Sequence, residues 1–100
     1  MDRELARRLP EVAALCRRHR VARLDVFGSA ARKAEGAADL DLLVELEDLP
    51  AGTHADAYFG LLEDLEALLA RPVDLVMASA LRNPFLRDSI ERSRCLLYGA

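Results

Sequence analysis

Apolar residues recur along this 100-residue chain at two spacings, and the change of spacing predicts the order of its helices and strands. Across residues 2–19 they return every three or four positions, which is the period of an amphipathic helix. Pro10 either kinks that helix or lies in the first turn of its firm part. The helical period returns across residues 53–70, and an Asn-Pro helix start predicts a last helix across residues 83–92.

Between these helices, short apolar or alternating runs predict four strands. They cover residues 21–27, 39–46, 73–77 and 94–99. A short alanine-rich helix beginning at Ser29 is expected between the first two strands. The predicted order is therefore α-β-α-β-α-β-α-β, which indicates a sheet covered by helices.

The link between the first two strands decides the kind of sheet. It holds about ten residues with its helix, which is at the lower limit for a crossover between parallel strands. An antiparallel or mixed pairing is thus expected. We predict an α+β fold, a small mixed β-sheet flanked by helices, in which residues 1–100 form a single domain.

Composition and charge exclude several classes of protein. The formal net charge is −3, with 14 basic against 17 acidic residues, so no direct nucleic-acid binding is expected. Cys16 and Cys95 lie in no CxxC or Cys/His cluster, and we interpret both as reduced core residues rather than zinc ligands. The charged N-terminus and the short apolar runs indicate neither a signal peptide nor a membrane span, which favours a cytoplasmic protein.

Paired acids interrupt the second strand. Asp39 and Asp41 share one strand face with their Cα atoms ~6.6 Å apart, because a strand rises ~3.3 Å per residue. Two neighbouring carboxylates repel each other, and a divalent cation such as Mg²⁺ relieves the repulsion. Taken alone, the two acids are better explained as an ordinary solvent-facing pair, but Asp74, in the third strand, offers a third carboxylate. Asp25 is interpreted mainly as a surface acid.

The turn before those acids suits a phosphate. Gly28 and Ser29 lie between a strand and the start of a predicted helix, where free amide groups and the Ser29 hydroxyl can bind an anion. Arg32 and Lys33 could add positive charge in the next turn. The simpler alternative is that Ser29 only caps the helix.

Together these features resemble a known family. Gly28 and Ser29, followed after nine residues by Asp39 and Asp41 and later by the RPVDLV segment with Asp74, resemble the minimal nucleotidyltransferase (MNT) family of the polymerase-beta-like superfamily. The resemblance covers nearly the whole chain, including the closing NPFLRDSIERSRCLLYG. It departs from the family pattern in the link, which is one residue shorter than is frequent and has Ala where Ser often precedes the first Asp.

The resemblance implies both the chemistry and the ligands. It implies a nucleotidyltransferase fold and Mg²⁺-dependent transfer of a nucleoside monophosphate, with AMP from ATP as the expected case. By position, Gly28 and Ser29 would hold the triphosphate, and Asp39, Asp41 and Asp74 would bind the metal. Asp74 could also act as the base toward an acceptor hydroxyl.

The resemblance also implies a partner, because members of the family commonly act as antitoxins of HEPN-domain toxins, and some transfer AMP to a tyrosine of the toxin. We therefore expect a protein adenylyltransferase that acts as an antitoxin on a HEPN toxin. The alternative is a non-catalytic antitoxin that neutralises the toxin by binding it. A small-molecule transferase is disfavoured, since no residues remain for an acceptor domain, and self-association into a homo-oligomer is a further way to complete the pocket. His19 and His54 are expected to be exposed, and the hydroxyl of Tyr58 to reach solvent.

Overall fold

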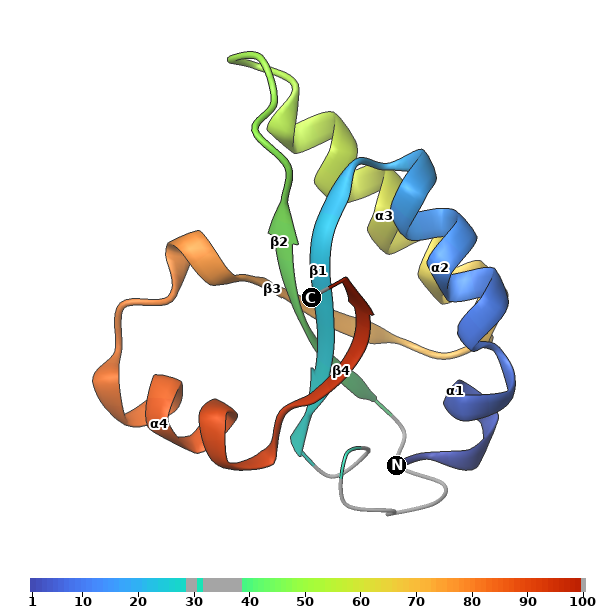
Figure 1. The fold of residues 1–100 in the computed structure, drawn as a ribbon, viewed down its shortest axis with the longest axis vertical. Coiled ribbons are helices and arrows are strands. Elements are labelled where there is room, and N and C mark those ends of the chain that lie inside the picture. The colour runs from blue at the N-terminus through green and yellow to red at the C-terminus, as the bar shows by residue number, and fades with distance from the viewer. Residues whose placement is uncertain (29–30, 32–38, 100) are drawn as a thin grey trace.

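The structure, a computed structural model, describes residues 1–28, 31 and 39–99. Its elements, in chain order, are α1 (Arg3–Arg7), α2 (Leu9–Arg18), β1 (Val21–Phe27), β2 (Leu40–Leu46), α3 (His54–Leu69), β3 (Val73–Met77), the 3₁₀ turn η2 (Ala78–Ala80), α4 (Pro84–Ser93) and β4 (Cys95–Gly99) (Figure 1). The first expected helix is two helices that meet at Arg8, with Pro10 in the first turn of α2, where its missing amide hydrogen costs nothing. The helix expected to begin at Ser29 lies outside the described residues.

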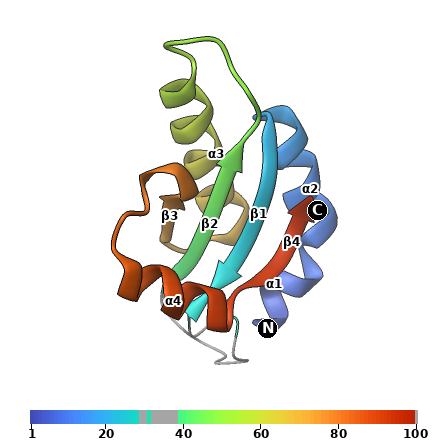
Figure 2. The same ribbon diagram turned by 60° about the vertical axis from the view of Figure 1, so that its left-hand side comes forward.

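The sheet is mixed, as predicted from the short link between the first two strands. Its strand order is β3-β2-β1-β4. β1 pairs antiparallel with both β2 and β4, whereas β2 pairs parallel with β3. Helices α2 and α3 lie together on one side of the sheet and α4 lies on the other (Figures 1 and 2). The two faces of the sheet therefore have different surroundings.

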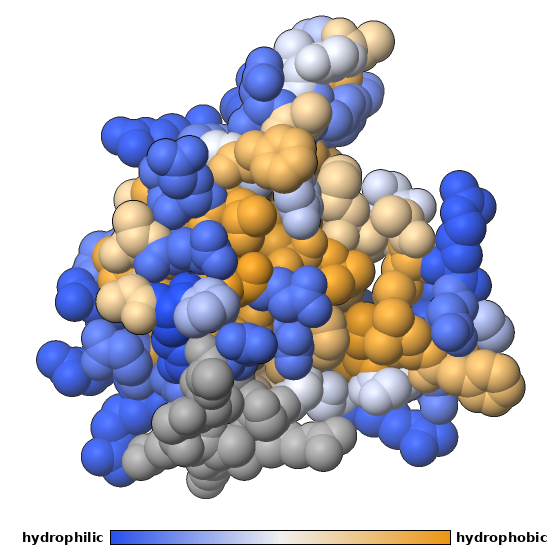
Figure 3. Space-filling view, turned by 180° about the vertical axis from the view of Figure 1, so that it is seen from behind, coloured by the Kyte–Doolittle hydropathy of each residue, from blue (hydrophilic) through white to orange (hydrophobic). Residues whose placement is uncertain are grey.

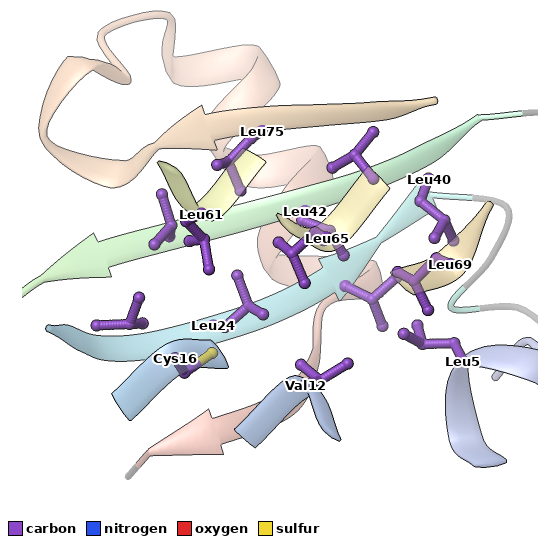
Figure 4. Packing of buried hydrophobic residues seen from close by; sticks show 14 residues of the cluster. Leu5, Val12, Cys16, Leu24, Leu40, Leu42, Leu61, Leu65, Leu69 and Leu75 are labelled. Atoms are coloured by element: carbon purple, nitrogen blue, oxygen red, sulfur yellow. The ribbon is translucent and has the colours of Figure 1, made fainter. Parts of the chain in front are cut away.

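The main core fills the space between the sheet and helices α1 to α3. Figure 4 shows leucines of the strands, such as Leu24 and Leu42, facing Leu61 and Leu65 of α3. Each of these four side chains is fully buried, which stabilises the fold by roughly 1.5–3 kcal/mol per residue. Cys16 belongs to the same cluster, and burial raises the pKa of its thiol to about 12, so it is an unreactive core residue as expected. Cys95 is also a free thiol but is half-buried.

One sequence expectation about a polar side chain is wrong. His19 is half-buried rather than exposed: its Nε2 lies 2.6 Å from Oδ2 of Asp64, and that hydrogen bond lowers the pKa of the Asp64 carboxyl. The imidazole fits because Gly60 has no side chain, and a Cβ there would lie 2.8 Å from His19 Cε1. The hydroxyl of Tyr58 donates to the carbonyl of Leu75 at 2.6 Å, which ties α3 to β3.

His54 is exposed, as expected. Within the described part of the chain, no helix combines the length and the apolar character that crossing a membrane requires.

Candidate active site

Asp41 and Asp74 lie side by side on neighbouring strands. Asp41 is the register partner of Asp74 in the parallel pairing of β2 with β3. The residues on either side of each acid are buried in the main core, so both acids lie on the opposite face of the sheet. Adjacent strands are about 4.8 Å apart, which brings the two carboxyl groups close together. The sequence expectation that Asp74 would lie beside the first pair agrees with this register.

Asp39 is the third acid near this place. It lies directly before β2 and is exposed. Burial and the negative charges of Asp74 and Asp39 raise the pKa of the Asp41 carboxyl. All these causes act in the same direction, so ionising Asp41 is less favourable in the folded protein than in an unfolded chain.

The carboxylate oxygens of these acids suit a hard divalent cation, although they do not by themselves surround one. Among residues 1–28, 31 and 39–99, no three His, Cys, Asp or Glu side chains gather closely enough to hold a metal ion as they stand. Carboxylate oxygens are nevertheless the ligands that Mg²⁺ takes, and it commonly keeps waters and substrate phosphate as its other ligands. A cation would also relieve the repulsion that raises the pKa of Asp41.

Gly28 lies against these carboxylates at the end of β1. Its φ is +73°, a left-handed conformation, and a Cβ at this position would lie 2.8 Å from Oδ2 of Asp41. Its amide donates to Oγ of Ser93, at 3.2 Å, a contact that no feature of the sequence indicated. Ser29 and Arg32, the other two predicted phosphate-binding residues, lie outside the described residues.

Asp25 corrects the expectation of a surface acid. It is 1% exposed and lies between the guanidinium groups of Arg23 and Arg94. Burial alone would raise the pKa of its carboxyl, but the hydrogen bonds and charges of the two arginines more than offset burial, and the pKa is lowered. Arg23 was the available signal, because it lies two residues before Asp25 and so on the same strand face.

A groove elsewhere on the molecule does not suit the phosphates of a nucleotide. It has a volume of about 430 Å³ and lies at the far ends of β2 and β3, away from Asp41 and Asp74. Three acids, Glu45, Glu47 and Asp48, contribute to its lining. These acids would repel the negative charge of a triphosphate. On the face with Gly28, a bound cation can lie between the acids and the triphosphate and bind both.

Comparison with known proteins shows the family to which this chain belongs. The family model of the nucleotidyltransferase domain matches residues 12–97. The chain belongs to this nucleotidyltransferase family. Within it the chain resembles the Methanocaldococcus jannaschii protein MJ0128, named as a protein adenylyltransferase, with 36% identity over 75 residues that cover 74% of each chain.

Solved structures show the same fold. The nucleotidyltransferase superimposes with a TM-score of 0.74 on a structure described as a minimal nucleotidyltransferase, at 40% identity and with 95% of each chain covered. A structure of a tri-AMPylated Shewanella oneidensis HEPN toxin with its MNT antitoxin matches with a TM-score of 0.67 over 96% of this chain and 73% of that one. At 20% identity, that match shows the fold alone. The predicted fold class and the predicted membership of the minimal nucleotidyltransferases are thus confirmed, and the protein is a transferase enzyme.

Proposed function

We propose that the nucleotidyltransferase is a Mg²⁺-dependent protein adenylyltransferase that moves AMP from ATP to a tyrosine hydroxyl of a HEPN toxin and so acts as its antitoxin. The observation that supports this most is the register of Asp41 with Asp74, on the sheet face opposite the main core and beside the turn at Gly28. That face offers carboxylates for a cation and a backbone turn for phosphate at one place.

Each side chain then has a role in the transfer. Asp39, Asp41 and Asp74 would hold Mg²⁺, which when bound neutralises charge on the triphosphate and on the leaving group. The acceptor hydroxyl oxygen bonds to the α-phosphorus as the bond from that phosphorus to the bridging oxygen breaks, and pyrophosphate leaves. The hydroxyl proton passes to Asp74, whose side chain is exposed and so accessible to an acceptor.

The relatives suggest the acceptor. MJ0128 is named as a protein adenylyltransferase, and the Shewanella oneidensis complex holds an AMPylated HEPN toxin with an MNT antitoxin. The same assignment for this chain makes a HEPN toxin the acceptor and its inactivation the purpose of the reaction.

The test is transfer of label from ATP to a HEPN-domain protein from the same genome. With α-³²P-ATP and Mg²⁺ the toxin should gain label, whereas γ-³²P-ATP should leave it unlabelled because the γ-phosphate departs with pyrophosphate. Asp41→Asn should lower the rate by at least about a hundredfold, since it removes a group that holds charge in the transition state. Asp48→Asn, which removes an exposed acid elsewhere, is the matched control. The proposal is wrong if no label transfers or if Asp41→Asn transfers at the wild-type rate.

Direct masking of the toxin is the second candidate, and α4 favours it. Phe85 and Leu86 of this helix are 84% and 44% exposed, and Figure 3 shows apolar residues continuing across the rear face toward the side where α4 lies. Such a surface suits contact with another protein. A variant with both Asp39→Asn and Asp41→Asn that still neutralises the toxin would establish masking, whereas loss of neutralisation with retained binding would establish catalysis.

A further inference from the structure

The last residue of α4 contacts the turn at Gly28. The Gly28 amide donates to Oγ of Ser93 at 3.2 Å, and the Ser93 hydroxyl donates in turn to the carbonyl of Ser89 at 3.3 Å. A serine hydroxyl has one proton and two lone pairs. Because the proton is directed to Ser89, a lone pair remains for the Gly28 amide, and the hydroxyl connects the helix to the turn.

The neighbouring arginine holds Ser93 in place. Arg94 binds Asp25 through two parallel hydrogen bonds, Nε to Oδ2 at 3.0 Å and Nη2 to Oδ1 at 3.1 Å. Such a two-point contact fixes direction as well as distance. Ile90 is the one described residue of α4 that is buried, so packing constrains this helix weakly. The ion pair between Arg94 and Asp25 therefore sets where the C-terminal end of α4 lies relative to β1.

We propose that Ser93 is a positioning residue for the nucleotide, because its hydroxyl holds the Gly28 turn in register with Asp41. The inference rests on the proposed function, since it concerns the same site. Gly28 packs so tightly against Asp41 that a Cβ would lie 2.8 Å from the Oδ2 atom. A turn that shifts by a fraction of that distance changes the place where phosphate and carboxylate meet.

The direction of the effect follows from the role of the hydroxyl. Without it the Gly28 amide loses its partner, the backbone at Gly28 is held less firmly against Asp41, and nucleotide binding must order it. Ser93→Ala should therefore raise the KM for ATP about fivefold, the equivalent of one hydrogen bond, and change kcat little. Ser93→Thr keeps the hydroxyl and should restore the KM.

Two measurements test the proposal, one without nucleotide and one with it. Amide hydrogen exchange at Gly28, measured by NMR in the free protein, should be several-fold faster in Ser93→Ala than in wild type or Ser93→Thr. Titration with a non-hydrolysable ATP analogue and Mg²⁺ should show about fivefold weaker binding by Ser93→Ala. Ser79→Ala, at an exposed position in η2, serves as the control and should match wild type in both.

The outcomes separate this inference from the proposed function. Unchanged exchange at Gly28, or equal or tighter nucleotide binding by Ser93→Ala when the wild type binds normally, overturns the role of Ser93 and leaves the proposed function intact. A wild-type protein that binds no nucleotide refutes the proposed function and this inference together.

Discussion

Two acids on the same face of the sheet have opposite surroundings. Asp25 in β1 accepts hydrogen bonds from Arg23 and Arg94, and its pKa is lowered even though burial alone would raise it. Asp41, on the neighbouring strand, has Asp74 and Asp39 as the charged groups that shift its pKa, and these add to the effect of burial. Asp25 therefore has cationic partners in the free protein, whereas the charged groups that shift the pKa of Asp41 are both negative.

The difference separates an acid that serves the fold from one that serves a ligand. A paired carboxylate stabilises the protein by holding β1, β4 and α4 together. An unpaired carboxylate opposite another acid costs stability, and such a cost persists at sites where a ligand supplies the missing charge. Both acids lie in similar apolar strand sequences. The presence of Arg23 and Arg94 beside Asp25 therefore distinguishes the structural acid from the one that awaits a ligand.

The largest expected effect is the loss of the Asp25 pair. Asp25→Ala should lower the free energy of unfolding by about 3 kcal/mol, because two guanidinium groups lose a buried partner. The loss is not larger because both guanidinium groups can still reach water. Urea denaturation at pH 7 measures it. Asp88→Ala breaks an exposed pair with Arg92 and should cost under about 0.5 kcal/mol. Equal losses in both variants would mean that Asp25 contributes no more than a surface ion pair.

A methyl group at Gly28 should displace the Asp41 carboxylate and slow AMP transfer. Gly28→Ala and Gly52→Ala both place a side chain at positive φ, +73° and +87°, and each should cost about 1–2 kcal/mol of stability. At Gly52 the new Cβ meets nothing within 4 Å, whereas at Gly28 it meets Oδ2 of Asp41 at 2.8 Å. Displacing that carboxylate should slow AMP transfer roughly a hundredfold in Gly28→Ala alone. Similar transfer rates in the two variants would show that the turn does not position Asp41.

The sequence pattern predicted the elements well because the main core has a regular period. The apolar face of α3 and the buried residues on either side of Asp41 and Asp74 both follow from local spacing, and they place these two acids away from the main core. The short link between β1 and β2 was enough to predict a mixed sheet.

What the sequence could not predict depends on contacts between distant residues. Arg94 lies 69 residues from Asp25, and Ser93 lies 65 residues from Gly28. Those contacts exist because β4 pairs with β1 rather than with β3, a choice that local spacing does not encode. The pairing of Asp25 with Arg94 and the contact of Ser93 with Gly28 were missed for this reason.

Lowering the pH should change the contributions of Asp25 and Asp41 to stability in opposite directions. The pKa of Asp25 is lowered in the folded state, so its stabilising contribution is complete above its unfolded pKa of about 4 and is lost as pH falls through the folded value. The stability difference between wild type and Asp25→Asn should therefore shrink below pH 4, by at most about 1.4 kcal/mol per pH unit. Asp2, whose pKa is also lowered, keeps part of the acid sensitivity in the variant. A difference that stays constant down to pH 2 would contradict the pairing.

The smallest expected effect is a gain in stability on removing the Asp41 charge. The pKa of Asp41 is raised in the folded state, so ionisation at pH 7 opposes folding, and Asp41→Asn should stabilise the protein by up to about 1 kcal/mol. The gain should fade as pH falls toward 4, where the wild-type carboxyl becomes protonated.

Thermal and urea unfolding at pH 7 and pH 4 measure this gain, with Asp48→Asn as the control for net charge. The same substitution should slow AMP transfer at least about a hundredfold, so a variant that is more stable yet much less active would mark Asp41 as an acid kept for its ligand. A destabilised Asp41→Asn would instead place Asp41 with Asp25, as a carboxylate that the fold itself requires.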